Sequence, residues 1–200
     1  MTFAAIALMT SATLAPQGGA RAEVKAQVGK EAPVFSLPST ANKTVTLDEF
    51  KGKYVVLEWT NHGCPVVAGH YNSGNMQKQQ AAAKDMDVVW LSIVSSKPGS
   101  QGAVSPEEGE AIRKEKRFNS AATLLDPSGA TGKTYGARTT PHMYVIDPKG
   151  VLIYNGAIDD NARGDKAAPR QHVLEALKEA MAGKEVSVKT SQPYGCGIKY

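Results

Sequence analysis

The stretch that decides the fold is Tyr54-Val55-Val56-Leu57-Glu58-Trp59-Thr60, followed directly by Asn61-His62-Gly63-Cys64-Pro65. Its first seven residues form an apolar run interrupted by one acid, Glu58, and such a run predicts a buried central strand. Proline fits the first position of a helix, where its missing N–H group is no loss, so we expect a helix to open at Cys64-Pro65. The chain therefore passes from a buried strand straight into a helix.

The segments on either side alternate between strand and helix patterns. Upstream, apolar runs at 34–37 and 44–47 flank the turn-like segment 40–43, which predicts a β-hairpin. Downstream, the patterns predict a helix to about Lys84 with a weak point at Ser73-Gly74, a strand at 88–94, a helix from the capping box Ser105-Pro106-Glu107-Glu108 to about Arg117, a strand at 123–125, a helix at 130–135, strands at 142–146 and 151–155, and a helix from Pro169 to Gly183. This order predicts one α/β domain, followed by a tail at 184–200.

The composition is that of an ordinary globular protein, with 42% hydrophobic and 21% charged residues among 200. The net charge of +4 comes without any run of five or more Lys or Arg, which argues against a nucleic-acid groove. Only two cysteines are present, Cys64 and Cys196, too few for a disulfide-rich scaffold or a four-thiolate zinc site.

Residues 1–22 have the layout of a secretory signal peptide. The stretch 3–14 is apolar and small, Pro16 breaks it, and Ala20-Arg21-Ala22 forms an A-x-A cleavage site. Because spanning a bilayer needs about 20 apolar residues, we expect no stable membrane insertion. Cleavage would place the protein in the periplasm or outside the cell, where disulfides persist. A disordered leader on a cytosolic protein is the alternative.

Cys64 is the first residue that carries chemistry. At the start of a helix, free amide N–H groups and the positive end of the helix dipole stabilise a thiolate, which is the reactive form of cysteine. Gly63 before it and Pro65 after it favour this interpretation over that of an inert buried cysteine.

Several motifs resemble those of a known family. They are Gly29-Lys30-Glu31-Ala32-Pro33-Val34-Phe35-Ser36-Leu37, Leu47-Asp48-Glu49-Phe50-Lys51-Gly52-Lys53-Tyr54-Val55-Val56-Leu57, Tyr135-Gly136, Thr140-Pro141, and Val145-Ile146-Asp147 with Gly150. Together they resemble the thioredoxin-like superfamily, in its alkyl hydroperoxide reductase/thiol-specific antioxidant (redoxin) branch. The resemblance implies a thioredoxin-like α/β fold over residues 29–183, with a central mixed sheet, helices on both faces and an N-terminal β-hairpin.

The resemblance to true peroxiredoxins fails at three positions. That family has a proline seven residues and a threonine or serine three residues before its peroxidatic cysteine, where this chain has Leu57 and Asn61. Its catalytic arginine aligns with Pro141, and Arg138 is out of register. Peroxide reduction needs groups that hold and polarise the O–O bond, so these departures weigh against efficient peroxidase chemistry.

The thioredoxin register fits better. Glu58 lies six residues before Cys64, as the buried acid of thioredoxins does, and such an acid can accept and return a thiol proton. A carboxylate reaching solvent from the strand end is the alternative. Thr140-Pro141 matches the family's cis-proline, which lies beside the reactive thiol. The second cysteine of a C-x-x-C motif is replaced by Val67.

Without that second thiol, the only internal partner for Cys64 is Cys196, in Pro193-Tyr194-Gly195-Cys196-Gly197-Ile198-Lys199-Tyr200. The adjacent glycines give the tail freedom to approach a site, and its aromatic residues could dock it. A Cys64–Cys196 bond would stabilise the fold by roughly 5 kcal/mol in the chain-entropy model. It could be a structural clamp or a resolving disulfide, and an intermolecular link is the third alternative.

The histidines and one acidic segment suggest metal binding only weakly. His62 and His142 are both placed near Cys64 by this register, and one cysteine with two histidines could hold copper or zinc. We expect no resident metal or cofactor, because the spacing is poor for a chelate. His70 and His172 are expected at the surface of helices. Asp159-Asp160 with Asp165 lacks the spacing of an EF-hand and reads as a solvated loop.

Three functions are compatible with these residues. In the first, Cys64 attacks a protein or small-molecule disulfide, Cys196 resolves the product, and an unidentified thiol donor restores the pair. In the second, the protein is a weak thiol peroxidase that reduces peroxides through a Cys64 sulfenic acid. The third is a non-enzymic copper- or peptide-binding module with a permanent Cys64–Cys196 bond.

Overall fold

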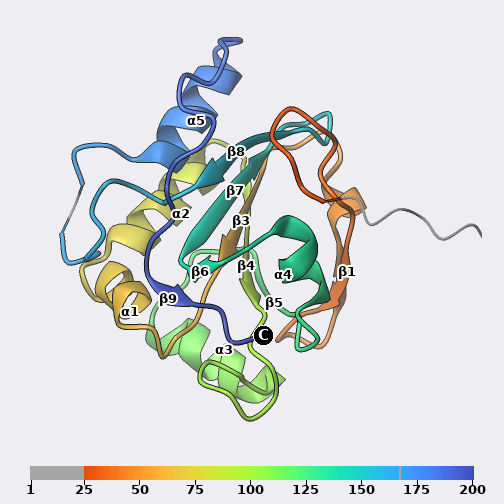
Figure 1. Ribbon diagram of the computed structural model, residues 1–200, viewed down its shortest axis with the longest axis vertical. Coiled ribbons are helices and arrows are strands. Elements are labelled where there is room, and N and C mark those ends of the chain that lie inside the picture. Colours follow the sequence, from red (N-terminus) through yellow and green to blue (C-terminus); the bar gives the residue numbers. More distant parts are fainter. Residues whose placement is uncertain (1–24, 167) are drawn as a thin grey trace, which may run out of the picture.

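A five-stranded mixed sheet in the order β5-β4-β3-β7-β8 forms the centre of the protein (Figure 1). The computed structural model describes residues 25–166 and 168–200, so the predicted signal peptide lies outside the described residues. The strands are β3 (Val55–Trp59), β4 (Val89–Val94), β5 (Ala122–Leu125), β7 (His142–Ile146) and β8 (Leu152–Gly156). β3, β4 and β5 are parallel, whereas β7 and β8 each run antiparallel to the preceding neighbour. The predicted central strand is indeed β3, and it is buried along its whole length.

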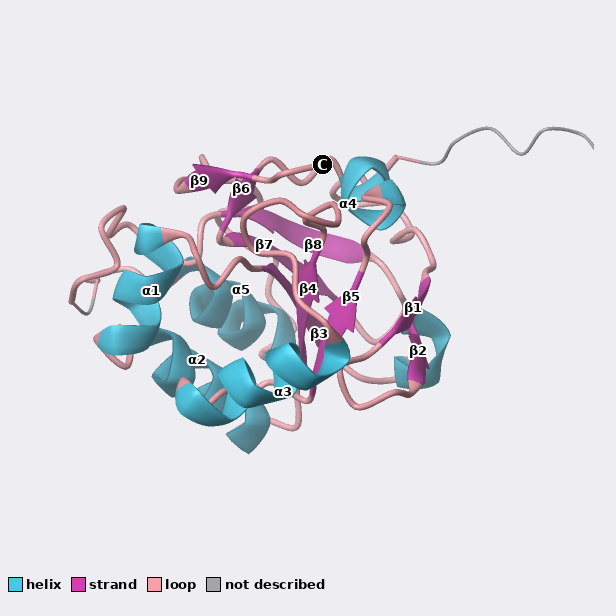
Figure 2. Ribbon diagram, turned by 90° about the horizontal axis from the view of Figure 1, so that it is seen from below, coloured by secondary structure: helices cyan, strands magenta, loops and turns pink. Residues whose placement is uncertain are grey.

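Helices cover both faces of this sheet, as predicted (Figures 1 and 2). One face carries α1 (Pro65–Asn72), α2 (Asn75–Asp85) and α5 (His172–Met181); the other carries α4 (Ala130–Tyr135), the 3-10 helix η1 (Leu47–Phe50) and the hairpin of β1 (Ser36–Pro38) and β2 (Thr44–Thr46). The remaining helix, α3 (Pro106–Glu115), lies beside β5, where Arg113 donates hydrogen bonds to Ser120 and Thr123. Its N-terminus has the predicted capping box of Ser105 and Glu108.

The alternation of side chains along β3 creates two separate cores. Val56 packs in the cluster under α1, α2 and α5, while Leu57 and Trp59 pack in the cluster under α4 and the hairpin. Glu58 points to the same side as Val56. The buried strand therefore delivers one acid to the face that also carries α1.

Two helix boundaries differ from the prediction. The helix expected to run from Pro65 to Lys84 is broken into α1 and α2, because Gly74 adopts the left-handed conformation with φ of 75°. The last helix begins at His172 rather than Pro169, since Gln171, with φ of −114° and ψ of 85°, is its N-cap. A further pair of strands, β6 (Thr139–Thr140) and β9 (Cys196–Gly197), was not predicted.

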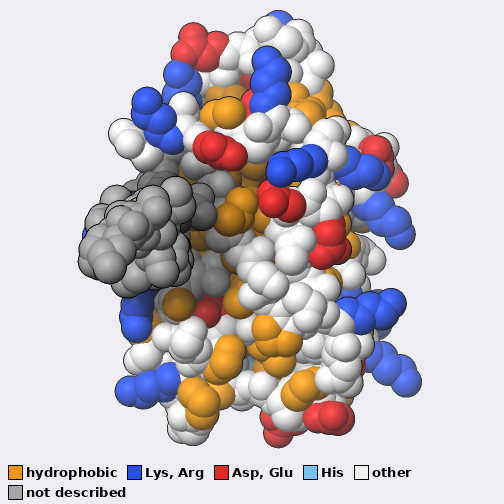
Figure 3. Space-filling model, turned by 90° about the vertical axis from the view of Figure 1, so that its right-hand side faces the viewer, with side chains coloured by type: hydrophobic (Ala, Val, Ile, Leu, Met, Phe, Trp, Pro, Cys, Tyr) orange, Lys and Arg blue, Asp and Glu red, His pale blue; other side chains and the backbone are white. Residues whose placement is uncertain are grey.

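The surface carries charges of both signs. On the face shown in Figure 3, Lys and Arg side chains alternate with Asp and Glu and do not gather into one basic stripe. In the chain from residue 25 onward, leaving out residue 167, none of the helices combines the length and apolar character needed to span a bilayer.

Candidate functional site

The turn between β3 and α1 presents Cys64. The side-chain oxygen of Asn61 accepts a hydrogen bond from the Gly63 amide at 2.8 Å, and its carbonyl accepts one from the Cys64 amide at 3.0 Å. Cys64 is the N-cap of α1, with an extended backbone at φ −82° and ψ 121°. Asn61, which sequence reasoning treated only as a departure from peroxiredoxins, thus shapes the turn that carries the cysteine.

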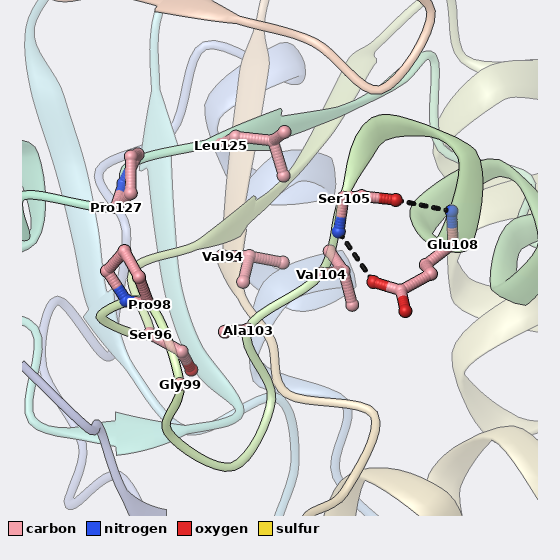
Figure 4. A pocket seen from close by; sticks show the side chains of 10 residues that line it. All are labelled: Val94, Ser96, Pro98, Gly99, Ala103, Val104, Ser105, Glu108, Leu125 and Pro127. Atoms are coloured by element: carbon pink, nitrogen blue, oxygen red, sulfur yellow. Dashed lines mark hydrogen bonds between the residues drawn. The ribbon is translucent and has the colours of Figure 1, made fainter.

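The loop 97–104 supports this turn from outside. The side-chain Nε2 of Gln101 donates to the Gly63 carbonyl at 2.9 Å, and the side-chain Nδ2 of Asn61 donates to the Gln101 backbone carbonyl at 3.2 Å. A side chain at Gly102 would meet Asn61 at 2.3 Å, so only glycine allows this close approach. The same loop lines a mainly apolar pocket of about 330 Å³ at the ends of β4 and β5 (Figure 4).

The thiol of Cys64 meets the proline loop and the C-terminal tail. Its Sγ donates a hydrogen bond to the Thr140 carbonyl at 3.3 Å, and the Thr140–Pro141 peptide bond is cis. Thr140 is paired with Cys196 in the antiparallel β6–β9 ladder. The structure therefore brings together Cys64, Thr140, Pro141 and Cys196, and it holds both cysteines as free thiols.

The two thiols differ in acidity. Burial raises the pKa of Cys64, but hydrogen bonds from the Cys196 side chain, the Val67 amide and Thr140 outweigh this effect, and the pKa lies below the ordinary cysteine value. Burial, followed by the interaction with Cys64, raises the pKa of Cys196 to about 11. The negative charge of the pair therefore resides on Cys64, at the start of the helix.

Glu58 is completely buried on the α1 side of the sheet. Its carboxylate accepts hydrogen bonds from Tyr71, Gln80, Trp90 and Ser92 at 2.8–3.2 Å. Burial raises its pKa against the opposing effect of these donors. Glu58 does not reach solvent from the strand end, and neither cysteine is among its hydrogen-bond partners.

The predictions for His70 and for the Asp159-Asp160 segment were partly wrong. His70 is fully buried, and Asp159 is buried as well, whereas Asp160 and Asp165 are exposed as expected. The reason is a polar contact that the sequence does not reveal, because its members are far apart: Asn75 donates to Asp159 and contacts His70, and Tyr194 of the tail contacts both. His172 is half-buried rather than at the surface.

The remaining histidines do not converge on Cys64. His62 is exposed, and His142 is buried, with its Nε2 2.7 Å from the side-chain oxygen of Asn155. Burial lowers the pKa of His142 to about 4, so this ring is neutral at pH 7. In the part of the chain that the structure describes, no three His, Cys, Asp or Glu side chains are grouped to hold a metal ion.

A cysteine at the helix N-cap, facing a cis-proline beside a central mixed sheet, defines a thioredoxin-like redox protein. Two solved structures share the fold. A hypothetical protein from Sinorhizobium meliloti 1021 has a TM-score of 0.77 at 24% identity, covering 87% of this chain and 94% of that one. The thioredoxin domain of a thiol-disulfide oxidoreductase from Bacteroides vulgatus has a TM-score of 0.50 at 20% identity, covering 64% and 87%.

The chain belongs to the redoxin family, whose model matches residues 27–171. Among related sequences, a chloroplastic peroxiredoxin Q of Triticum aestivum is 29% identical over 165 residues, covering 77% of this chain and 66% of the wheat protein. The match thus spans about two thirds of that relative's length. The thiol-disulfide oxidoreductase ResA of Bacillus thuringiensis is 26% identical over 137 residues, covering 68% of this chain and 73% of ResA.

Proposed function

We propose that this redoxin is a thiol-disulfide oxidoreductase in which Cys64 is the nucleophile and Cys196 resolves the mixed disulfide. The observation that carries the proposal is the pair itself: two free thiols meet at Thr140 beside cis-Pro141, since Cys64 contacts the Thr140 carbonyl and Cys196 pairs with Thr140 in the β6–β9 ladder. Their pKa values are shifted in opposite directions. A low pKa suits the attacking thiol, and a nearby second thiol is the requirement for resolution. The relationship to ResA agrees with this assignment.

The proposed reaction has two exchanges. The Cys64 thiolate attacks one sulfur of a protein or small-molecule disulfide, forms a mixed disulfide and releases the first substrate thiolate. Cys196 then loses its proton and attacks the Cys64 sulfur, which forms the Cys64–Cys196 bond and releases the second thiolate. The two cysteines are oxidised and the substrate disulfide is reduced. A thiol donor reverses the oxidation of the pair by the same chemistry.

Cys196 is protonated in the reduced pair, where its pKa is raised to about 11, so its proton needs an acceptor before it can attack the mixed disulfide. We assign this role to Glu58, whose raised pKa suits an acid that takes up and returns a proton. None of its hydrogen-bond donors is a thiol, so this assignment requires a water molecule or a movable side chain to carry the proton from Cys196 to Glu58.

A stoichiometric experiment tests the assignment of the cysteines. The reduced full chain is mixed with 5,5′-dithiobis(2-nitrobenzoic acid), and the release of the coloured thiolate is followed over time. The wild type is expected to release two equivalents, the first on attack by Cys64 and the second on attack by Cys196. Cys196→Ser should release one equivalent rapidly, and Cys64→Ser should lose the rapid first release. A rapid first release from Cys64→Ser would refute the proposal.

Peroxide reduction is the second candidate, favoured by the similarity to peroxiredoxin Q. Here the Cys64 thiolate attacks a peroxide oxygen, giving a sulfenic acid and an alcohol or water, and Cys196 condenses with the sulfenic acid to release water. Against it, Leu57 and Asn61 occupy the positions at which peroxiredoxins have a proline and a threonine or serine. Stopped-flow oxidation by hydrogen peroxide separates the candidates, because a dedicated peroxidase reacts far faster than a free thiol.

We also propose that the protein works outside the cytosol. Support comes from the apolar stretch and A-x-A site of residues 1–22. N-terminal sequencing of protein secreted by a bacterial host should then begin at Glu23; an intact Met1 would contradict the proposal.

A further inference from the structure

The tail forms a strap across one edge of the sheet (Figures 1 and 2). It starts beside β8, where Thr190 bridges to Asn155 and the Ser191 hydroxyl contacts Tyr154. It then pairs with β6 through Cys196, and farther on the Ile198 amide donates to the Arg138 carbonyl. Cys196 thus lies in the middle of a docked segment.

Tyr194 fastens this strap from its N-terminal side. Its hydroxyl donates a hydrogen bond to Asp159 and lies 3.2 Å from His70 Nε2, and its ring stacks on the His70 ring. Asn75 donates to Asp159 at 2.7 Å and lies 2.8 Å from His70 Nδ1. His70, Asn75 and Asp159 are all buried, so the Tyr194 hydroxyl occupies a polar socket inside the protein.

The hydrogen-bond pattern of the socket is complete. The Asn75 amide supplies hydrogens to His70 Nδ1 and to Asp159, which assigns the hydrogen of the neutral His70 ring to Nε2, facing the Tyr194 oxygen. The Tyr194 hydrogen is then free to point at Asp159. Burial lowers the pKa of His70, against the opposing charges of Asp159 and Asp165, which agrees with a neutral ring.

The position of Tyr194 determines the position of Cys196. Only Gly195 lies between them, with φ of +110°, and a side chain there would meet the Thr140 carbonyl at 2.1 Å. The backbone therefore passes tightly over the proline loop on its way from the socket to the thiol. Because Gly195 is the only residue between them, a movement of Tyr194 also moves Cys196.

The docked strap has two opposite effects on Cys64. It brings Cys196 opposite Thr140, the residue whose carbonyl accepts the hydrogen bond from Cys64, and packs it against the cluster that contains Cys64. The Cys64 side chain is also 0% exposed, in a cluster against which Tyr194 and Cys196 pack. An external disulfide therefore cannot reach Cys64 while the strap is docked, whereas the resolving thiol can.

We propose that Tyr194 is a positioning residue that acts as a releasable latch. Its release from the socket of His70, Asn75 and Asp159 admits the substrate to Cys64, and its return brings Cys196 back to resolve the mixed disulfide. This role rests on the proposed function of the two cysteines and assigns to Tyr194 the balance between the two steps.

The latch predicts effects of opposite sign from one variant. Tyr194→Phe keeps the ring and removes both hydroxyl contacts. In the stopped-flow reaction with 5,5′-dithiobis(2-nitrobenzoic acid), its first release should be faster than that of the wild type. Its second release should be about tenfold slower, the factor that corresponds to one lost hydrogen bond to a charged group. Asp159→Asn alters the socket from the other side and should show the same pattern.

Lys189→Ala is the matched control, because Lys189 lies in the exposed start of the tail and its ammonium pairs with Glu185. It should leave both phases unchanged. Equal slowing of both phases, or no change, in Tyr194→Phe and Asp159→Asn would overturn the latch, since a general loss of stability cannot accelerate one step and slow the other. A wild type that releases a single equivalent would instead refute the resolving role of Cys196, and the latch with it.

Discussion

The two cysteines are held by different kinds of structure. Cys64 is fixed by the framework, between the end of the fully buried β3 and the first turn of α1. Cys196 is held by a two-residue strand and by the tyrosines on either side of it. The contrast shows that one thiol is built into the core while the other is attached by contacts that can open separately.

The second tyrosine fastens the far end of the tail. The Tyr200 hydroxyl donates to the Ala137 carbonyl at 2.8 Å, and Lys133 lies 5.5 Å from the centre of its ring. Added side chains at Gly129 or Gly132 would meet this ring or its hydroxyl at 2.4 Å. The glycines of α4 and its N-cap therefore make room for the end of the strap.

The largest effect on the rate of Cys64–Cys196 disulfide formation is expected from Gly195→Val. Valine at φ of +110° is strained, and its Cβ would meet the Thr140 carbonyl, so the strap cannot dock in register. We expect formation of the Cys64–Cys196 disulfide to slow by about a hundredfold, as a loss of roughly 3 kcal/mol implies. The rate is measured as the second thiol release. Gly183→Ala is the control, because Gly183 also has a positive φ but lies away from the site where the tail docks. Closure at the wild-type rate would show that docking does not depend on this passage.

A smaller effect is expected on the acidity of Cys64. Cys196→Ala removes a side-chain donor that lowers the Cys64 pKa, so the pKa should rise. At a pH below the Cys64 pKa, the variant should therefore hold a smaller fraction of thiolate than the wild type. Thiolate absorbance at 240 nm against pH gives the value. Cys196→Ser keeps a hydroxyl donor, so its Cys64 pKa should lie between those of the wild type and Cys196→Ala. An unchanged Cys64 pKa in Cys196→Ala would contradict a contact between the two side chains.

The smallest of these effects is expected from Glu58→Gln. This variant removes the proposed proton acceptor of Cys196, so it should slow closure, though less than Gly195→Val does, and it should also change the stability. Because the folded pKa of Glu58 is raised, its contribution to stability is fully present below the unfolded value of about 4.3 and is lost as pH rises through the folded pKa. Each unit of the shift corresponds to about 1.4 kcal/mol. Urea unfolding at several pH values should show this decline in the wild type and a flatter profile in Glu58→Gln. Parallel profiles would mean that Glu58 does not titrate in this range.

The framework half of the site is predictable from local sequence. The apolar run of β3, the proline after Cys64 and the turn signals encode it in neighbouring residues, and the family resemblance supplies Thr140-Pro141. The tail half depends on contacts between distant residues. Tyr194 meets His70 from 124 positions away, and no periodicity marks either residue. His70 was expected at the surface because a polar helix residue is buried only where partners from elsewhere satisfy it.

One consequence of the strap concerns the mobility of residues 196–199. While both thiols are free, residues 196–199 are held by noncovalent contacts, including the hydrogen bond from the Lys97 amide to the Lys199 carbonyl. Once a Cys64–Cys196 bond forms, the same residues are tied to the core by a covalent link. The backbone amide hydrogens of residues 196–199 should therefore exchange with solvent more slowly when this bond is present than when both thiols are free.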